Sequence, residues 1–369
     1  MQIEEQLTDW VQLINSENVG PITFYKLLNI YKNAATALSE LPKFPKYKLF
    51  PRDLAKREIE KAQKQKIQLI TRQSPLYPES LRHIEDAPPV LYVAGNIQLL
   101  QNPLSLSVVG ARNASINGRK TASKIAYDLT NSGVLIISGM ARGIDSAAHK
   151  GAMYAKNQQG ETLAVLGTGV DVIYPSENKA LYRQILENGA VISEFPLGYE
   201  AQSSNFPRRN RIVSALSLGT LVVEASLHSG SLITARLALE QGKDIFAVPG
   251  SPQDGRALGP NKLIKDGATL VENAEDILQA LQLNNQKQII QYVDKLQKNA
   301  DIPQMSLPDA TSAGVKTPLL DYINREGVYV DELIRASGLS ASEVSLELLE
   351  LEMNGRIERQ VGNKVALIK

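Results

Sequence analysis

Three arginines and an aromatic ring are concentrated in one short segment of this sequence. The segment consists of Phe206, Pro207, Arg208, Arg209, Asn210 and Arg211. A guanidinium is planar and donates several hydrogen bonds at once, which suits it to phosphate, and an aromatic ring offers a surface on which an unpaired base can stack. The whole chain has 40 Lys+Arg and 39 Asp+Glu, for a net charge of +1, so this positive charge is a local feature. The segment therefore predicts an anionic ligand, and a nucleic acid in particular.

Glycines accompanied by arginine, serine or threonine follow several short apolar runs. These groups are Gly110 with Arg112, Gly139 with Arg142, Gly167 with Thr168, and Gly230 with Ser231. Glycine lets a backbone approach a ligand closely, and the free amides at a helix start favour anions. One glycine at a strand end is common for folding reasons alone, but four such ends on one sheet edge indicate a binding site. The spacing is neither a dinucleotide fingerprint nor a P-loop.

The sequence carries few residues that could catalyse a reaction. It has no nucleophile elbow with a Ser-His-Asp order and no metal-ligand cluster, and its three histidines are scattered. We expect Asp145 to cap a helix or pair with an arginine, and His149 to be a structural histidine. These features favour binding over turnover, so we predict a protein that is not an enzyme and uses no cofactor or metal.

The central part of the chain alternates between apolar runs and helical segments. The expected strands are 104–109, 134–138, 162–166, 190–193, 220–223 and 244–248, and the expected helices are 117–131, 144–155, 175–188, 209–216 and 231–241. Short β-branched runs separated by helices predict an α/β fold with a doubly wound parallel sheet. Ligands of such sheets bind at the carboxyl ends of the strands, where the strand order reverses.

Two smaller modules flank this central part, which we place at residues 66–282. Residues 1–65 are expected to be helical, with a Val-Gly-Pro turn near Pro21 and a connector at 42–55; they form either a helix-hairpin-helix or SAM-like module or a plain bundle. Residues 283–315 are expected to form a linker. Residues 316–369 show three helical segments and two alternating strands, the pattern of a winged helix.

Composition sets the outer limits of this interpretation. A chain of 369 residues, 43% of them hydrophobic, can build two or three domains. Cysteine is absent, which suits a reducing, cytoplasmic compartment. No apolar run approaches the ~20 residues that a membrane helix needs, and the first residues lack the order of a signal peptide.

Taken together and in this order, the motifs resemble the DNA-processing protein A (DprA/Smf) family. The segments that carry the resemblance are 109–112, 138–145, 206–211 and 229–234. The resemblance implies an extended Rossmann-like domain that binds single-stranded DNA and forms a homodimer. It also implies a mediator that protects incoming strands in natural transformation and loads the RecA recombinase, without enzymatic activity.

The resemblance also assigns roles to individual residues. Arg112 and Arg211 would contact phosphates, Arg209 would support them, and Phe206 would stack on a base. Gly110, Gly139, Gly230 and Ser231 would supply close backbone approach, and Arg142, Lys179, Arg208 and Asn210 complete the predicted single-strand site. Arg208 and Arg211 are spaced i, i+3 and therefore share a helix face. Arg209 is expected to point toward Glu194 or Asp145.

This chain departs from the family pattern at two positions. Family members often have a lysine where this chain has Ser203, and another where it has Ser176, although Lys179 follows one turn later. Both departures predict a less basic pocket, unless Lys179 and Arg208 compensate.

Two other functions remain as alternatives. A sheet with glycine-rich strand ends also resembles nucleoside-monophosphate phosphoribohydrolases, in which Glu224 or Asp145 would be the acid–base residue, but their Pro-Gly-Gly-x-Gly-Thr loop is missing here. The winged helix could read duplex DNA, but residues 342–353 carry Glu343, Glu347, Glu350 and Glu352, which would repel phosphate.

Overall fold

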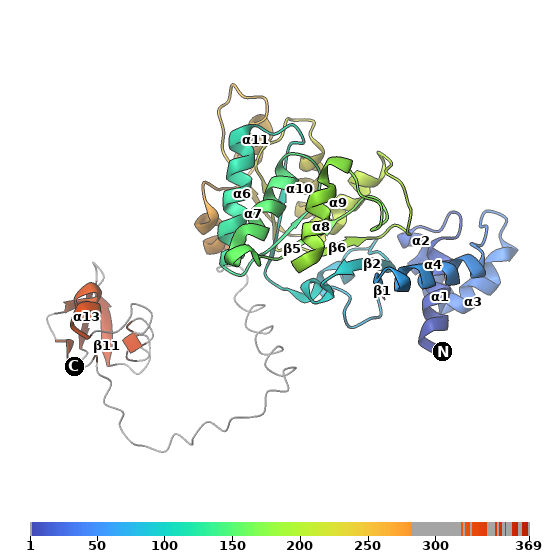
Figure 1. Cartoon of the computed structure of the whole chain (residues 1–369), viewed down its shortest axis with the longest axis horizontal. Helices are drawn as coiled ribbons and strands as arrows, with labels where there is room; N and C mark the ends of the chain where they lie inside the picture. Colours follow the sequence, from blue (N-terminus) through green and yellow to red (C-terminus); the bar gives the residue numbers. More distant parts are fainter. Residues whose placement is uncertain are drawn as a thin grey trace, which may run out of the picture. The chain divides into compact units, whose positions relative to one another are not determined.

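The computed structural model of the chain describes residues 2–281 and part of the C-terminal region (Figure 1). In that region it describes residues 319, 322–324, 327–337, 344, 347–348, 351, 356–360 and 364–367. The chain divides into two compact units, Met1–Asn299 and Ala300–Lys369. The expected linker at 283–315 lies outside the described residues.

A single sheet forms the centre of the first unit. Within residues 2–281 it has nine strands in the order β1-β2-β6-β5-β4-β3-β7-β8-β9. The parallel strands are β3 (Ser105–Val109), β4 (Leu135–Ser138), β5 (Thr162–Val165), β6 (Ala190–Ser193), β7 (Gly219–Val222), β8 (Asp244–Ala247) and β9 (Thr269–Leu270). The predicted doubly wound parallel sheet is confirmed. The chain runs outward from β3 to β6 and then returns to β7 on the other side of β3, which places the switch point between β3 and β7.

Two antiparallel strands extend one edge of this sheet and were missed by the sequence analysis. They are β1 (Gln68–Thr71) and β2 (Val90–Gly95), and β2 pairs antiparallel with β6. The short helices α5 (Glu79–Arg82) and η2 (Ile97–Gln101) lie in the connections around β2. The sheet is therefore mixed, although most of its strands are parallel.

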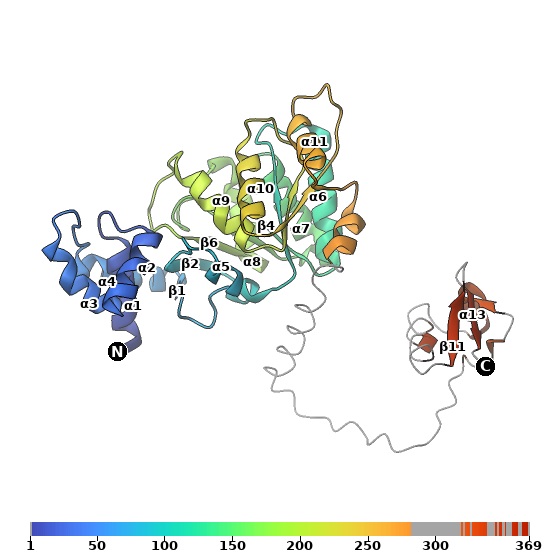
Figure 2. The same ribbon diagram turned by 180° about the vertical axis from the view of Figure 1, so that it is seen from behind.

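Helices cover both faces of the sheet (Figures 1 and 2). On one face α6 (Ile116–Asn131) and α7 (Ile144–Gln158) pack over β3, β4 and β7. On the other face α9 (Asn205–Ala215) and α10 (Gly230–Glu240) share a core with the same strands. Further helices of this part are η3 (Ser176–Asn178), α8 (Lys179–Asn188) and α11 (Leu258–Lys265), and residues 274–281 are helical as well. No helix of the described residues is long and apolar enough to cross a bilayer.

The arginine-rich segment lies inside α9 rather than in front of it. The sequence analysis placed the start of this helix at Arg209, but the helix begins at Asn205. Pro207 is tolerated there because the first amides of a helix have no partner within the helix. The first turn of α9 therefore carries both Phe206 and Arg208.

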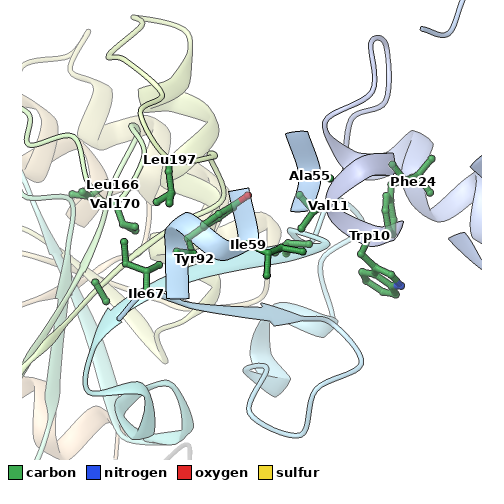
Figure 3. Packing of buried hydrophobic residues seen from close by; sticks show 14 of the residues in the cluster. Trp10, Val11, Phe24, Ala55, Ile59, Ile67, Tyr92, Leu166, Val170 and Leu197 are labelled. Atoms are coloured by element: carbon green, nitrogen blue, oxygen red, sulfur yellow. The ribbon is translucent and has the colours of Figure 1, made fainter. Parts of the chain in front are cut away.

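The N-terminal helices share an apolar core with the sheet. They are α1 (Gln2–Ile14), α2 (Pro21–Tyr31), α3 (Ala34–Glu40), η1 (Leu41–Lys43) and α4 (Arg52–Lys64), so the connector expected at 42–55 ends earlier, where α4 begins. The rings of Trp10 and Phe24 pack with their centroids 4.9 Å apart. In Figure 3, Ile59 of α4 extends toward Tyr92 of the sheet, and both belong to one buried cluster. Leu197 adds a backbone N–H that donates to Glu58 Oε1 at 2.7 Å.

The C-terminal unit has the elements of a winged helix. Its described strands are β10 (Val328–Tyr329), β11 (Ile357–Gln360) and β12 (Lys364–Leu367), in the order β10-β12-β11, and α13 spans Val330–Ser337. The two predicted wing strands pair antiparallel, as expected, and β10 is an additional partner. Most of the acidic segment 342–353 lies outside the described residues.

Candidate nucleic-acid interface

A cleft of about 730 Å³ opens at the carboxyl edge of the sheet, at the switch point between β3 and β7. Residues from the loop 109–113, from the start of α9 and from the segment 226–234 form most of its wall, and Arg256 lies at its rim. This position follows from the topology, because the loops after β3 and β7 diverge where the strand order reverses. We refer to this hollow below as the cleft.

Arg112 and two aromatic rings form one wall of the cleft. The guanidinium of Arg112 lies 5.2 Å from the centroid of the Phe206 ring. The centroid of the Tyr174 ring lies 5.3 Å from that of Phe206, and the two ring planes are tilted against each other. Arg112 is exposed, and within residues 2–281 no ion pair joins it to a carboxylate. The cation is therefore held by a cation–π contact and keeps its donors available for an anion.

Arg209 is a buried neighbour of this wall. Its Nη1 donates to the carbonyl oxygens of Gly139, at 2.6 Å, and of Val165. The pKa of Arg209 is lowered to about 10, mainly by burial; the charge of Asp145 opposes this shift and that of Arg112 adds to it. The guanidinium thus stays charged at neutral pH and ties α9 to the ends of β4 and β5. The supporting role at a DNA site that the family resemblance implied for Arg209 stays a prediction.

Asp145 organises the loop after β4. Its Oδ2 accepts the backbone N–H groups of Gly139 at 3.2 Å and Ala141 at 3.4 Å. Burial raises the pKa of Asp145, and the charge of Arg209 opposes that rise. Met140, between the two amides, has a positive φ of 54°, which is costly for a residue with a side chain. The N-cap of α7 is Gly143, so Asp145 holds this loop and faces Arg209 rather than capping the helix.

Arg208 and Arg211 share a helix face, as their spacing predicted, and both contact Glu194. Arg208 Nη2 lies 3.0 Å and Arg211 Nη2 lies 2.7 Å from Glu194 Oε2, and Arg211 Nε lies 2.7 Å from Asp86. The Arg211 side chain is 6% exposed, whereas that of Arg208 is 44% exposed. Neither residue lines the cleft. Direct contact between Arg211 and a phosphate would require this buried ion pair to open.

The remaining predicted cations lie beside the cleft. Arg142 is exposed and its Nη1 lies 3.5 Å from Glu177 Oε1, and Lys179 is exposed at the first residue of α8. Neither lines the cleft. Asn210 does line it, accepting from Arg209 Nε at 3.3 Å and donating to the carbonyl of Gly230 at 3.4 Å.

The predicted glycines serve the fold in different ways. A Cβ on Gly139 would overlap the Arg209 guanidinium, and one on Gly110 would lie 2.5 Å from Ile144 Cγ1. Glycine is therefore required at both positions because neighbouring protein side chains occupy the space that a Cβ would take. A Cβ on Gly230 would meet nothing within 4 Å, so this position leaves open space in the cleft wall. The Ser231 amide donates to the Ser229 hydroxyl at 3.3 Å, which caps α10.

The sequence analysis missed one cation of the cleft. Arg256 lies in the connection between β8 and α11, makes paired hydrogen bonds to Asp254 and lines the cleft together with Ser203. Ser203 is the position at which family members often carry a lysine, so Arg256 supplies a positive charge to the same hollow. Only the strand order, which places β8 beside β7, could have indicated it.

Glu224, which was considered for catalysis, and His149, which was expected to be structural, both have partners within the fold. Glu224 accepts from the Ser115 backbone N–H at 2.8 Å and from its hydroxyl at 2.5 Å, next to the start of α6. His149 is fully buried, and its Nδ1 lies 2.8 Å from the Thr162 hydroxyl. Burial lowers the pKa of His149 to about 3, and the charge of Arg209 contributes to this shift. His149 is therefore neutral and structural, as predicted.

Fold and site together define a class: a Rossmann-like α/β protein whose switch-point cleft combines an exposed arginine with aromatic rings. Comparison with protein families makes this more specific. The family described as DNA recombination-mediator protein A matches residues 68–282, the DprA winged helix domain matches 303–363, and the DprA-like N-terminal HHH domain matches 4–61. The chain belongs to this DprA/Smf family.

Individual relatives agree with this assignment. Protein Smf of Escherichia coli K12 is 41% identical over 303 residues, covering 81% of this chain and 77% of the relative. Protein Smf of Synechocystis is 32% identical and covers 96% of both chains. The crystal structure of DprA from Streptococcus pneumoniae aligns with a TM-score of 0.61 at 35% identity, covering 74% of this chain and 95% of the other. A structure of DprA from Helicobacter pylori, described by its single-stranded DNA binding mode, aligns with a TM-score of 0.52 at 29% identity, covering 59% and 97%.

Proposed function

We propose that this protein binds single-stranded DNA in the cleft as a recombination mediator. The observation that carries the proposal is the exposed Arg112 guanidinium, which lies over the Phe206 ring with no ion pair among the described residues. A cation and a ring at one point can contact a phosphate and its base together. Stacking requires an unpaired base, which favours a single strand over a duplex. The single-stranded DNA binding attributed to the Helicobacter pylori relative supports the same ligand.

In this proposal some residues of the cleft contact phosphates and others stack on bases. Arg112 and Arg256 contact phosphates, Phe206 stacks on a base, and Asn210 offers a side-chain amide at the same wall. Because these contacts read no base edge, binding is largely independent of sequence and weakens as salt rises.

The family description also supports a proposal for the wider role. We infer that the protein forms a homodimer, protects incoming strands in natural transformation and loads the RecA recombinase onto them. The family description as a DNA recombination-mediator protein supports this inference. A dimer would place two clefts on one strand and so raise the effective affinity.

Titration of a labelled oligo(dT) with the full chain tests the ligand class. We expect tighter binding to the single strand than to a duplex of equal length at the same salt concentration. Equal or tighter duplex binding would contradict the proposal.

The phosphoribohydrolase alternative has a separate test. Glu224 is engaged by Ser115, and Asp145 is held by two backbone amides, so neither carboxylate is free to act on a nucleotide in this arrangement. We therefore expect no release of base when the protein is incubated with nucleoside monophosphates. Sustained release that depends on Glu224 would establish the enzyme instead.

A further inference from the structure

A second hollow, of about 610 Å³, lies on the outer face of α6 and α7. Its floor consists of small residues, because the two helices approach closely there: a Cβ on Gly151 would overlap the Ser123 carbonyl oxygen. Longer side chains stand along both rims. We call this hollow the α6/α7 groove.

The rims of the α6/α7 groove are basic. Arg119, Lys120, Lys124 and Lys150 line it and are exposed, and no acidic residue lines it. Among the described residues, Lys124 pairs with Asp128 at 2.9 Å, whereas no ion pair joins Lys120 or Lys150 to a carboxylate. The groove therefore has a clear excess of positive charge, which is complementary to an anionic chain.

Two aromatic side chains stand among these cations. Tyr127 of α6 is 43% exposed and Tyr154 of α7 is 65% exposed, and both line the groove. Soluble proteins usually bury such rings more completely, and exposed rings grouped in a hollow often mark an interaction site. Rings interleaved with lysines are the pattern that sequence-independent binders present to single strands.

The residues that line the groove adjoin those that line the cleft at the starts of α6 and α7. Arg112 and Asn113 line the cleft, and Ile116 and Arg119 of the same segment line the groove. Arg119 Nη1 also donates to the Ala114 carbonyl at 2.7 Å, which holds the groove rim against this loop. In the first turn of α7, Asp145 lines the cleft and Ser146 lines the groove. A chain that leaves the cleft can thus pass over the starts of α6 and α7 into the groove.

We propose that the α6/α7 groove is a second subsite for single-stranded DNA, which continues a strand bound in the cleft. Lys120 and Lys150 contact phosphates, and Tyr127 and Tyr154 stack on bases. The continuity with the cleft favours DNA over an acidic peptide as the occupant. This inference rests on the proposed function.

A length series of oligo(dT) tests the subsite. A strand of about 6 nucleotides occupies the cleft alone, and one of about 16 reaches the groove as well. We expect Lys120→Gln with Lys150→Gln to reduce the salt slope for the long strand by about 1.4, at about 0.7 per phosphate contact. We expect Tyr127→Leu with Tyr154→Leu to weaken long-strand binding roughly tenfold or more. Affinity for the short strand should stay unchanged in both variants.

The controls separate this inference from the proposed function. Lys56→Gln with Lys64→Gln removes two exposed charges from α4 and should leave both strands bound as in the wild type. If the wild type binds the short strand and binds the longer strand no more tightly, the groove inference fails and the proposed DNA binding in the cleft remains. If the wild type binds neither strand, both fail. A third outcome would assign the groove to an acidic protein partner and overturn the inference. In that outcome poly-glutamate competes with the long strand for binding, and the groove variants bind the long strand as tightly as the wild type does.

Discussion

The three arginines of α9 are close in sequence but differ in burial and in the groups that they contact. Arg209 is buried and donates to carbonyl oxygens at the ends of two strands, and Arg211 is buried against Glu194 and Asp86. Arg208 is partly exposed but shares Glu194. The cluster therefore builds the cleft wall, while the most available cation of the cleft, Arg112, comes from another loop.

The role of Arg209 can be measured through stability. We expect Arg209→Met to lower the free energy of unfolding by about 3 kcal/mol, because Asp145 would keep a buried charge without its opposing charge. Urea denaturation of the variant and the wild type gives this difference. Asp145→Asn in the Arg209→Met background should recover part of the loss. Additive effects of the two substitutions would contradict the coupling between these side chains.

Residue types alone identified much of the candidate site, but not the burial of its members. Arg112, Phe206, Asn210 and the glycine loops were recognisable because their chemistry and position after strands are local features. The partners of Arg211 were not recognisable, because Glu194 and Asp86 are distant in sequence and become neighbours only through the sheet.

At the scale of elements, His149 connects α7 to two strands. Its Nδ1 contacts the Thr162 hydroxyl of β5, which in turn donates to the Ile136 carbonyl of β4 at 2.7 Å. That hydroxyl proton is already used, so the ring nitrogen is the donor. Burial disfavours a charged ring, and the positive charge of the nearby Arg209 adds to this effect, so the pKa of His149 is lowered.

This contact predicts an acid-sensitive fold. The unfolded chain takes up a proton at His149 as pH falls through 6.5, whereas the folded chain, with a pKa of about 3, does not. Stability contributed by this residue should therefore fall below pH 6.5, at up to about 1.4 kcal/mol per pH unit. Urea unfolding from about pH 7 to about pH 5 measures the slope. His149→Gln should flatten the dependence of stability on pH. Asp145, whose pKa is raised by burial, has the opposite effect on this dependence, but it is present in both proteins. An identical slope in the two proteins would contradict this account.

The alternating elements of the sheet were predictable, and its antiparallel edge was not. Strands β3 to β8 are short apolar runs separated by helices, and the helix boundaries mostly fell within a few residues of the observed ones. β1 and β2 lie in a stretch without that alternation, and they join the sheet through the distant β6. The position of Arg256 depended on the strand order, which local patterns do not contain.

For the whole molecule, the N-terminal helices and the sheet behave as one body. Their buried side chains form a continuous cluster, and Glu58 and Lys61 of α4 make polar contacts with Leu197 and Asp171. The cleft is therefore carried by a body larger than the α/β domain alone. The winged helix is a separate unit, and the expectation that its acidic segment 342–353 serves protein contacts rather than DNA binding stays a prediction.

The central claim is that Arg112 and Phe206 hold a single strand in the cleft, and the salt dependence of oligo(dT) binding tests it most directly. We expect Arg112→Ala to reduce the slope of log K against log salt by about 0.7, the value of one phosphate contact. Phe206→Leu should weaken binding about 5- to 150-fold with the slope unchanged, because stacking releases no counterions. Arg57→Ala, an exposed charge on α4, serves as the matched control. An Arg112→Ala slope equal to that of the wild type would contradict the account.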